Sequence, residues 1–194
     1  IYFLVIFFFV KALLSPSFEE FSYFFLMNVI KISKFVFSLL VLLGNICSII
    51  GSLLYKAFFR KVATRTMILW AMIIGTVGLF FSFMLAKRWN LDIGIPDMAF
   101  LIFTDVVFSI VSVITYSLPI MAFFAKVTPK KVEGTVYAFL TGTMNFCSTV
   151  VSPGVGAFIN HQWVGVNKKD QSNYSTLILI GLIMHLFIFP LLLL

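Results

Sequence analysis

Four polar side chains in the apolar stretch 103–117 are spaced so that they lie on one face of a helix. Asp105, Ser109, Ser112 and Tyr116 follow one another at intervals of four, three and four residues. A charge deep in a bilayer costs at least about 2.5–3.5 kcal/mol on insertion scales. We therefore expect Asp105 to face a cavity, to pair with a cation or to carry a proton. An alternative is a shallow position, where its carboxylate reaches interfacial water or a nearby lysine.

A second charge, Lys11, also lies inside an apolar stretch. The sequence places it near the membrane edge that we expect soon after residue 14. Its ammonium group would either extend to the interface, as long cationic side chains do, or contact an acidic substrate.

Two further apolar stretches carry polar residues at helical spacing. Small polar residues often join membrane helices by hydrogen bonds, at about 0.6–2 kcal/mol each. The remaining stretches carry few polar residues, the last of them little beyond His185. This contrast predicts a bundle with lining helices and outer supporting helices. The striped positions are Ser38, Asn45, Ser48, Ser52 and Tyr55 in the first stretch, and Thr141, Asn145, Ser148 and Ser152 in the second.

The composition indicates a membrane protein. Of the 194 residues, 61% are hydrophobic and 11% are charged, whereas soluble domains have about 45–50% and about 25%. The basic residues stand between apolar stretches and form no nucleic-acid patch. Histidines and cysteines lack metal-ligand spacing, and no nucleotide-binding or nucleophile motif occurs. We therefore predict no enzyme, no cofactor and no metal site.

Six apolar stretches are expected to cross the bilayer, because a spanning helix needs about 20 mostly apolar residues. We interpret residues 15–33, with Pro16 and two glutamates, as an interfacial turn and short amphipathic helix, or as a helix that continues past the bilayer edge. The predicted fold is an all-α, integral, multi-pass membrane protein with one six-helix domain over residues 1–194. The passes are 1–14, interpreted as the end of a truncated helix, and 35–55, 66–86, 98–125, 134–159 and 175–194.

The loops divide between two sides of the membrane. Side A holds residues 56–65 and 126–133, and side B holds the other loops. Basic residues are almost equally frequent on both sides, so their number does not decide the orientation. The very short basic loops of side A give a mild preference for a cytoplasmic side A.

Several motifs carry a family resemblance. The loop "GSLLYKAFFRKVATRTMILW" resembles the gating loop between the second and third helices of a major facilitator superfamily half. The motifs "SPSFEEFSYFFLMN", "NLDIGIPDMAF" and "VEGTVYAFLTGTMNF" are similar, in this order, to the folate–biopterin transporters of that superfamily. The resemblance covers nearly all of the chain and implies the C-terminal half, passes seven to twelve. One departure is "TPKKVEGT", which lacks the cysteine and glycine that the family commonly has ahead of this motif.

The resemblance implies a secondary transporter of pterins and folates, coupled to protons and working by alternating access. Asp105 would carry the proton or contact the pterin, and Lys11 would meet a glutamate tail. The pathway would be lined by Ser109, Ser112, Tyr116 and Asn145, and the gate would consist of Tyr55, Arg65 and Glu133. Glu133 could equally be a simple helix cap.

Two alternatives remain open on the sequence alone. The same fold could carry another solute, such as a nucleoside, an amino acid or a drug. The chain could also be a half-length membrane scaffold that transports nothing. The expected partners are the lipid bilayer, a pterin- or folate-like small molecule and an N-terminal six-helix half, with no nucleic acid.

Overall fold

The computed structural model describes residues 1–188, and every regular element in them is helical. Residues 189–194, the end of the predicted pass 175–194, lie outside the described residues. The α-helices are α1 (Tyr2–Leu14), α2 (Glu19–Asn28), α3 (Lys34–Leu54), α4 (Thr64–Ala86), α5 (Trp89–Asp92), α6 (Asp97–Ser112), α7 (Leu118–Val127), α8 (Glu133–Phe146), α9 (Ser152–Ile159) and α10 (Tyr174–Leu186). The π-helical turns are η1 (Tyr55–Phe59), η2 (Val113–Ser117), η3 (Cys147–Val151) and η4 (Asn160–Val164).

Four stretches of the described chain are long and apolar enough to cross a membrane: Tyr2–Asn28, Lys34–Phe59, Thr64–Ala86 and Asp97–Val127. A further helical stretch, 133–164, and the shorter apolar helix α10 follow them. Large apolar side chains point outward along these helices; Phe3, for example, is 85% exposed. Such surfaces are stable in lipid and unfavourable in water. The prediction of an all-α, multi-pass membrane protein is confirmed, while the count of six passes stays a prediction.

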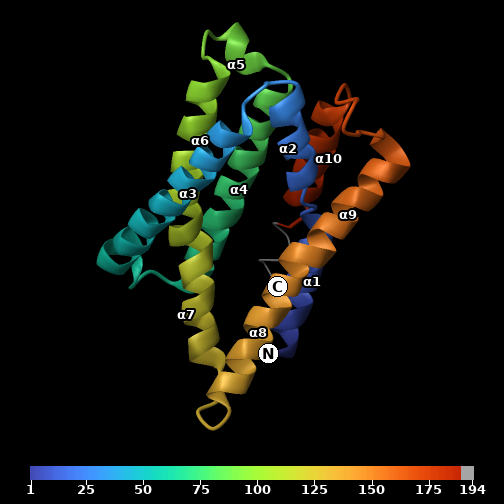
Figure 1. Ribbon diagram of the computed structural model, residues 1–194. Helices are drawn as coiled ribbons and strands as arrows, with labels where there is room; N and C mark the ends of the chain where they lie inside the picture. Colours follow the sequence, from blue (N-terminus) through green and yellow to red (C-terminus); the bar gives the residue numbers. More distant parts are fainter. Residues whose placement is uncertain (189–194) are drawn as a thin grey trace.

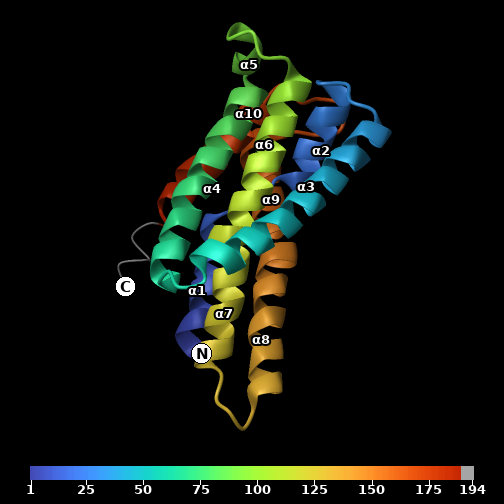
Figure 2. The ribbon, with the colours of Figure 1, turned by 90° about the vertical axis from the view of Figure 1, so that its left-hand side faces the viewer.

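The loops gather at two ends of the molecule. Figures 1 and 2 show loops 60–63 and 128–132 toward one end and the α5 turn, loop 29–33 and loop 165–173 at the other. The first group belongs to side A and the second to side B. The chain starts toward the side-A end, and α2 continues the crossing that α1 begins (Figures 1 and 2).

The first crossing changes the expected position of Lys11. Residues 15–33 were expected to leave the membrane, but the apolar stretch that contains Lys11 runs from Tyr2 to Asn28. Lys11 therefore lies well inside this stretch and farther from side B than the sequence suggested. The reason is that Pro16 marks a break within a crossing helix, which looks in sequence like the end of one.

The break between α1 and α2 is held against α9. Pro16 has no backbone N–H, and the neighbouring backbone groups need partners outside the helix. The Ser17 N–H donates to the Ser152 carbonyl (3.1 Å), and the Ser152 hydroxyl donates to the Ser15 carbonyl (2.5 Å). Gly156 permits this approach, because a Cβ at that position would overlap the Ser17 carbonyl oxygen.

Two of the π-helical turns precede prolines. The turn η2 ends just before Pro119, and η3 ends just before Pro153. A proline inside a helix removes one hydrogen bond and its ring collides with the carbonyl four residues earlier, so a wider turn relieves the conflict. Each turn rotates the side chains that follow it, and η2 carries one of the predicted pathway residues, Tyr116.

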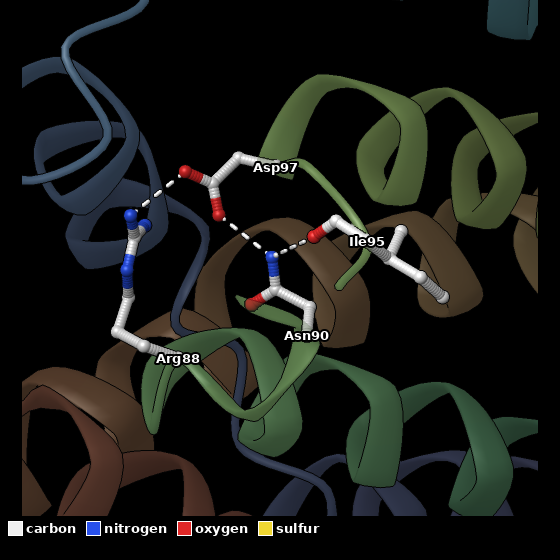
Figure 3. Close-up of polar contacts among 4 residues, drawn as sticks. All are labelled: Arg88, Asn90, Ile95 and Asp97. Carbon is white, nitrogen blue, oxygen red and sulfur yellow. Dashed lines mark hydrogen bonds and ion pairs between the residues drawn. The ribbon is translucent and has the colours of Figure 1, made fainter. Parts of the chain in front are cut away.

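A polar clamp closes the side-B turn between α4 and α6. Figure 3 shows Arg88 and Asn90 directed at the carboxylate of Asp97. The Arg88 Nη2 and the Asn90 Nδ2 each donate to it at 2.8 Å, and Nδ2 also donates to the Ile95 carbonyl (3.1 Å). Asn90 is fully buried. Because Asp97 is the first residue of α6, the clamp fixes where the helix that carries Asp105 begins.

Candidate functional site

Asp105 lies where α6 passes close to α3. A Cβ on Gly44 of α3 would lie 3.2 Å from Asp105 Oδ2 and 3.1 Å from the Ser109 hydroxyl oxygen. The glycine therefore lets the two helices meet at the acid. Asp105 Oδ2 is buried and forms no hydrogen bond with protein groups of the described chain. The carboxylate is thus available to a proton or to a donor on a ligand.

Asp105 opens into a cleft of about 740 Å³, which we call the Asp105 cleft. Its size is within the about 300–1,000 Å³ that is usual for small-molecule sites. Several aromatic rings and a few hydroxyl groups line it, an arrangement suited to a flat heteroaromatic ligand with polar edges. The lining includes Glu19, Ser22, Tyr23, Phe25, Phe81, Phe100, Thr104, Phe108 and Tyr174.

Lys11 lies over the ring of Tyr116, with its Nζ 3.6 Å from the ring centroid. A cation in this position is attracted by the negative face of the ring. Both residues line two smaller hollows, one of about 230 Å³ and one of about 120 Å³. We call the larger of these the Lys11 cavity. This contact differs from the expected extension of Lys11 to the interface.

Ser15 and His185 complete the polar lining of the Lys11 cavity on the side of α10. The Ser15 hydroxyl lies 3.1 Å from His185 Nδ1. His185 is buried, and its Nε2 forms no hydrogen bond of standard geometry with protein groups of the described chain. The Met72 carbonyl makes a hydrogen-bond interaction with the ring and also accepts from the Thr76 hydroxyl (3.0 Å), because a carbonyl oxygen has two lone pairs.

The Asp105 cleft and the Lys11 cavity are neighbours. Gly75 and Phe108 line both of them. Gly75 makes room for the imidazole, because a Cβ there would lie 3.2 Å from His185 Nε2. Phe108 is packed on Gly78, where a Cβ would lie 3.2 Å from the ring. A shared wall of one glycine and one ring leaves an acidic site beside a basic one.

The predicted polar stripe on α6 and η2 divides between these hollows. Asp105 and Ser109 meet α3 at Gly44, whereas Ser112 and Tyr116 line the Lys11 cavity. The hydroxyl of Ser112 also donates to the Ser109 carbonyl (3.2 Å), one turn earlier. The predicted residue Asn145 lies exposed on α8 and lines none of these hollows.

The predicted gate residues lie toward the side-A end. Tyr55 is in η1, Arg65 is in the first turn of α4, and Glu133 is the first residue of α8. In Figures 1 and 2 loop 128–132 extends well beyond loop 60–63 along the long axis. Glu133 contributes to a shallow hollow of about 370 Å³ with Thr128 and Tyr137. The gate residues share an end of the molecule, but their loops lie at different heights.

Sequence reasoning missed the part played by Ser15 and His185. His185 was noticeable as the polar residue of an otherwise apolar stretch. Its partner, however, lies 170 positions away, so no local spacing could pair the two. Ser15, the C-cap residue of α1, is one turn beyond Lys11, a neighbourhood that helical periodicity could have revealed.

The profile of the BT1 family matches residues 1–194. The chain belongs to the BT1 family. It is 29% identical to the probable folate-biopterin transporter 6 of Arabidopsis thaliana over 143 residues. This matched region covers 74% of the chain and 28% of that relative. It is 25% identical to the folate-biopterin transporter of Synechocystis sp. over 166 residues. This matched region covers 86% of the chain and 33% of that relative.

A third relative is folate transporter 1 of Plasmodium falciparum, 24% identical over 166 residues, 86% of this chain and 32% of that one. The chain thus spans about a third of the length of these curated relatives. No solved structure matches it significantly. These matches confirm the family that the sequence motifs indicated.

Proposed function

We propose that this BT1 family chain is part of a secondary transporter that carries pterins or folates across a membrane. The matched relatives are named as transporters of folate and biopterin, which supports this substrate class. Because the chain covers only about a third of their length, the transporter requires further helices. We propose that these form an N-terminal six-helix half, and that the two halves rock about a shared site.

The observation that carries the proposal is the carboxylate of Asp105 in the Asp105 cleft. Its Oδ2 has no protein hydrogen-bond partner in the described chain, and the cleft is lined by several aromatic rings. A carboxylate pairs well with the amino-pyrimidine edge of a pterin, which presents two parallel N–H donors. The same group can take up a proton, so we propose that coupling to protons acts through it.

The remaining predicted residues have supporting roles in this proposal. Ser109 and Ser112 line the path along α6, and Tyr116 holds Lys11. Tyr55, Arg65 and Glu133 act at the side-A end, where the two halves would close. Glu133 stands at the positive N-terminal end of α8, which stabilises its carboxylate when no gate partner is in reach.

Uptake measurements test the proposal. The complete reading frame that encodes this chain is expressed in cells, and the uptake of labelled biopterin and labelled folate is measured. Unlabelled pterins and folates are expected to compete, while nucleosides and amino acids are not. A transporter of another solute and a scaffold would both take up neither label, and uptake of labelled nucleosides or amino acids would distinguish these two.

A further inference from the structure

The imidazole of His185 presents a polar atom to the Lys11 cavity. The residue is 7% exposed, and its buried Nε2 forms no hydrogen bond of standard geometry in the described protein, although the Met72 carbonyl interacts with the ring. The other ring nitrogen, Nδ1, is held by the Ser15 hydroxyl at 3.1 Å. When Ser15 donates this hydrogen bond, Nε2 carries the ring proton and becomes a donor. A buried donor that has no well-formed hydrogen bond with the protein gains free energy when a ligand supplies an acceptor.

Lys11 supplies a cation to the same cavity. Its Nζ lies over the Tyr116 ring, and no carboxylate of the described chain pairs with it. Ser15, which caps α1 one turn after Lys11, lies 3.1 Å from His185 Nδ1, so the end of the helix that carries Lys11 packs against the imidazole. Three N–H donors on the ammonium group and one on the imidazole can then meet an anion between them.

The size of the Lys11 cavity limits what can bind. Its volume of about 230 Å³ is smaller than that of a usual ligand site. It is therefore suited to one end of a larger ligand. Gly75 and Phe108 line both this cavity and the Asp105 cleft, so the two hollows adjoin at these residues.

We propose that Lys11 and His185 together bind a carboxylate at one end of the substrate, while its ring system lies in the Asp105 cleft. His185 is thus a specificity-determining residue that favours substrates with an acidic tail over pterins without one. The inference rests on the proposed function for its substrate class. The carboxylate site itself follows from the geometry of the Lys11 cavity.

Binding of two separate probes tests the inference. p-Aminobenzoylglutamate carries carboxylates and no pterin, and biopterin carries a pterin and no carboxylate. The complete protein is purified in lipid nanodiscs, and its affinity for each probe is measured by calorimetry. The variants are Lys11→Gln and His185→Phe, which keeps a ring without donors. Gly142→Ala is the matched control, since a Cβ there meets nothing within 4 Å.

The two cavity variants are expected to weaken binding of p-aminobenzoylglutamate about tenfold or more, because each removes a charge-assisted hydrogen bond. Biopterin affinity should stay within about twofold of the wild-type value, which also shows that the variants fold. The control should bind both probes as the wild type does. Unchanged binding of the acidic probe, or equal losses for both probes, would overturn the inference.

The two probes also separate this inference from the proposed function. Wild-type binding of the acidic probe without biopterin would support the carboxylate site and contradict a pterin substrate. Binding of biopterin without the acidic probe would support a pterin substrate and contradict the carboxylate site. A protein that binds neither would contradict both.

Discussion

The Asp105 cleft and the Lys11 cavity are built in different ways. At Asp105, two continuous helices come together because Gly44 leaves room for the acid. At Lys11, irregular helices meet: the break at Pro16 in the first crossing and the π-helical turn η2. The comparison teaches that regular packing can place an acid, whereas the basic site depends on helices that depart from regular geometry. Irregular backbone at membrane depth is tolerated where protein surrounds it.

The two charges are also stabilised differently. Lys11 is held by the ring of Tyr116, which attracts a cation without neutralising it. Asp105 Oδ2 has no hydrogen-bond partner in the described protein. The wall of Gly75 and Phe108 keeps the acid and the base in separate hollows. Opposite charges that do not pair with each other remain free to bind opposite ends of one ligand.

The largest expected effect is a loss of stability at the helix break beside Lys11. In Gly156→Ala, the new Cβ would overlap the Ser17 carbonyl oxygen, so α9 and the helix break must separate. We expect a loss of about 1–3 kcal/mol or more in the free energy of unfolding, as for other overpacked sites. Thermal unfolding in detergent measures it. Gly154→Ala on the same helix is the control, because its Cβ meets nothing within 4 Å; equal stability of both variants would contradict the account.

A smaller effect is expected at the regular helix pair. In Gly44→Ala, the Cβ would lie 3.2 Å from Asp105 Oδ2 and 3.1 Å from the Ser109 hydroxyl oxygen. The side chains can yield by a few tenths of an ångström, so the protein should fold while the carboxylate shifts. Biopterin binding should weaken about threefold to tenfold. Affinity for p-aminobenzoylglutamate should not change, and a parallel loss would show that the two hollows are not independent. Gly134→Ala serves as the control.

The smallest expected effect concerns the contact between Lys11 and the ring of Tyr116. Tyr116→Leu removes the ring beneath Lys11, which at a partly exposed site is worth about 0.5–1 kcal/mol, or about twofold to fivefold in affinity. Tyr116→Phe keeps a ring and should lose less. Binding of p-aminobenzoylglutamate to the two variants measures the difference. Equal losses for phenylalanine and leucine would show that the phenol hydroxyl matters instead of the ring face.

Local sequence patterns predicted the helix face that carries Asp105 well. The spacing of Asp105 and Ser109 is a property of one helix, and the structure keeps both on the face that meets α3. That Gly44 would stand opposite them could not be predicted, because it depends on how two helices pack. The family motifs and the apolar composition were enough for the fold class and the family.

The surroundings of Lys11 were predicted less well, for physical reasons. Pro16 and two glutamates resemble the end of a membrane helix, and only hydrogen bonds to Ser152 show that the break is packed inside the bundle. The expected position of Lys11 near side B depended on where that helix was predicted to end. The contact between Ser15 and His185 joins the first and last described α-helices, and such tertiary contacts leave no periodic signal in the sequence.

The central claim is that the Asp105 carboxylate serves transport, and Asp105→Asn tests it most directly. Asparagine keeps the shape of the side chain but cannot carry a negative charge or exchange a proton. Biopterin is the substrate to use, because it has no carboxylate for the Lys11 cavity. Its uptake is measured for both proteins, at matched amounts in the membrane, across a range of external pH. We predict that the variant loses most of the uptake and that the remainder no longer depends on pH; unchanged uptake with an unchanged pH profile would contradict the account.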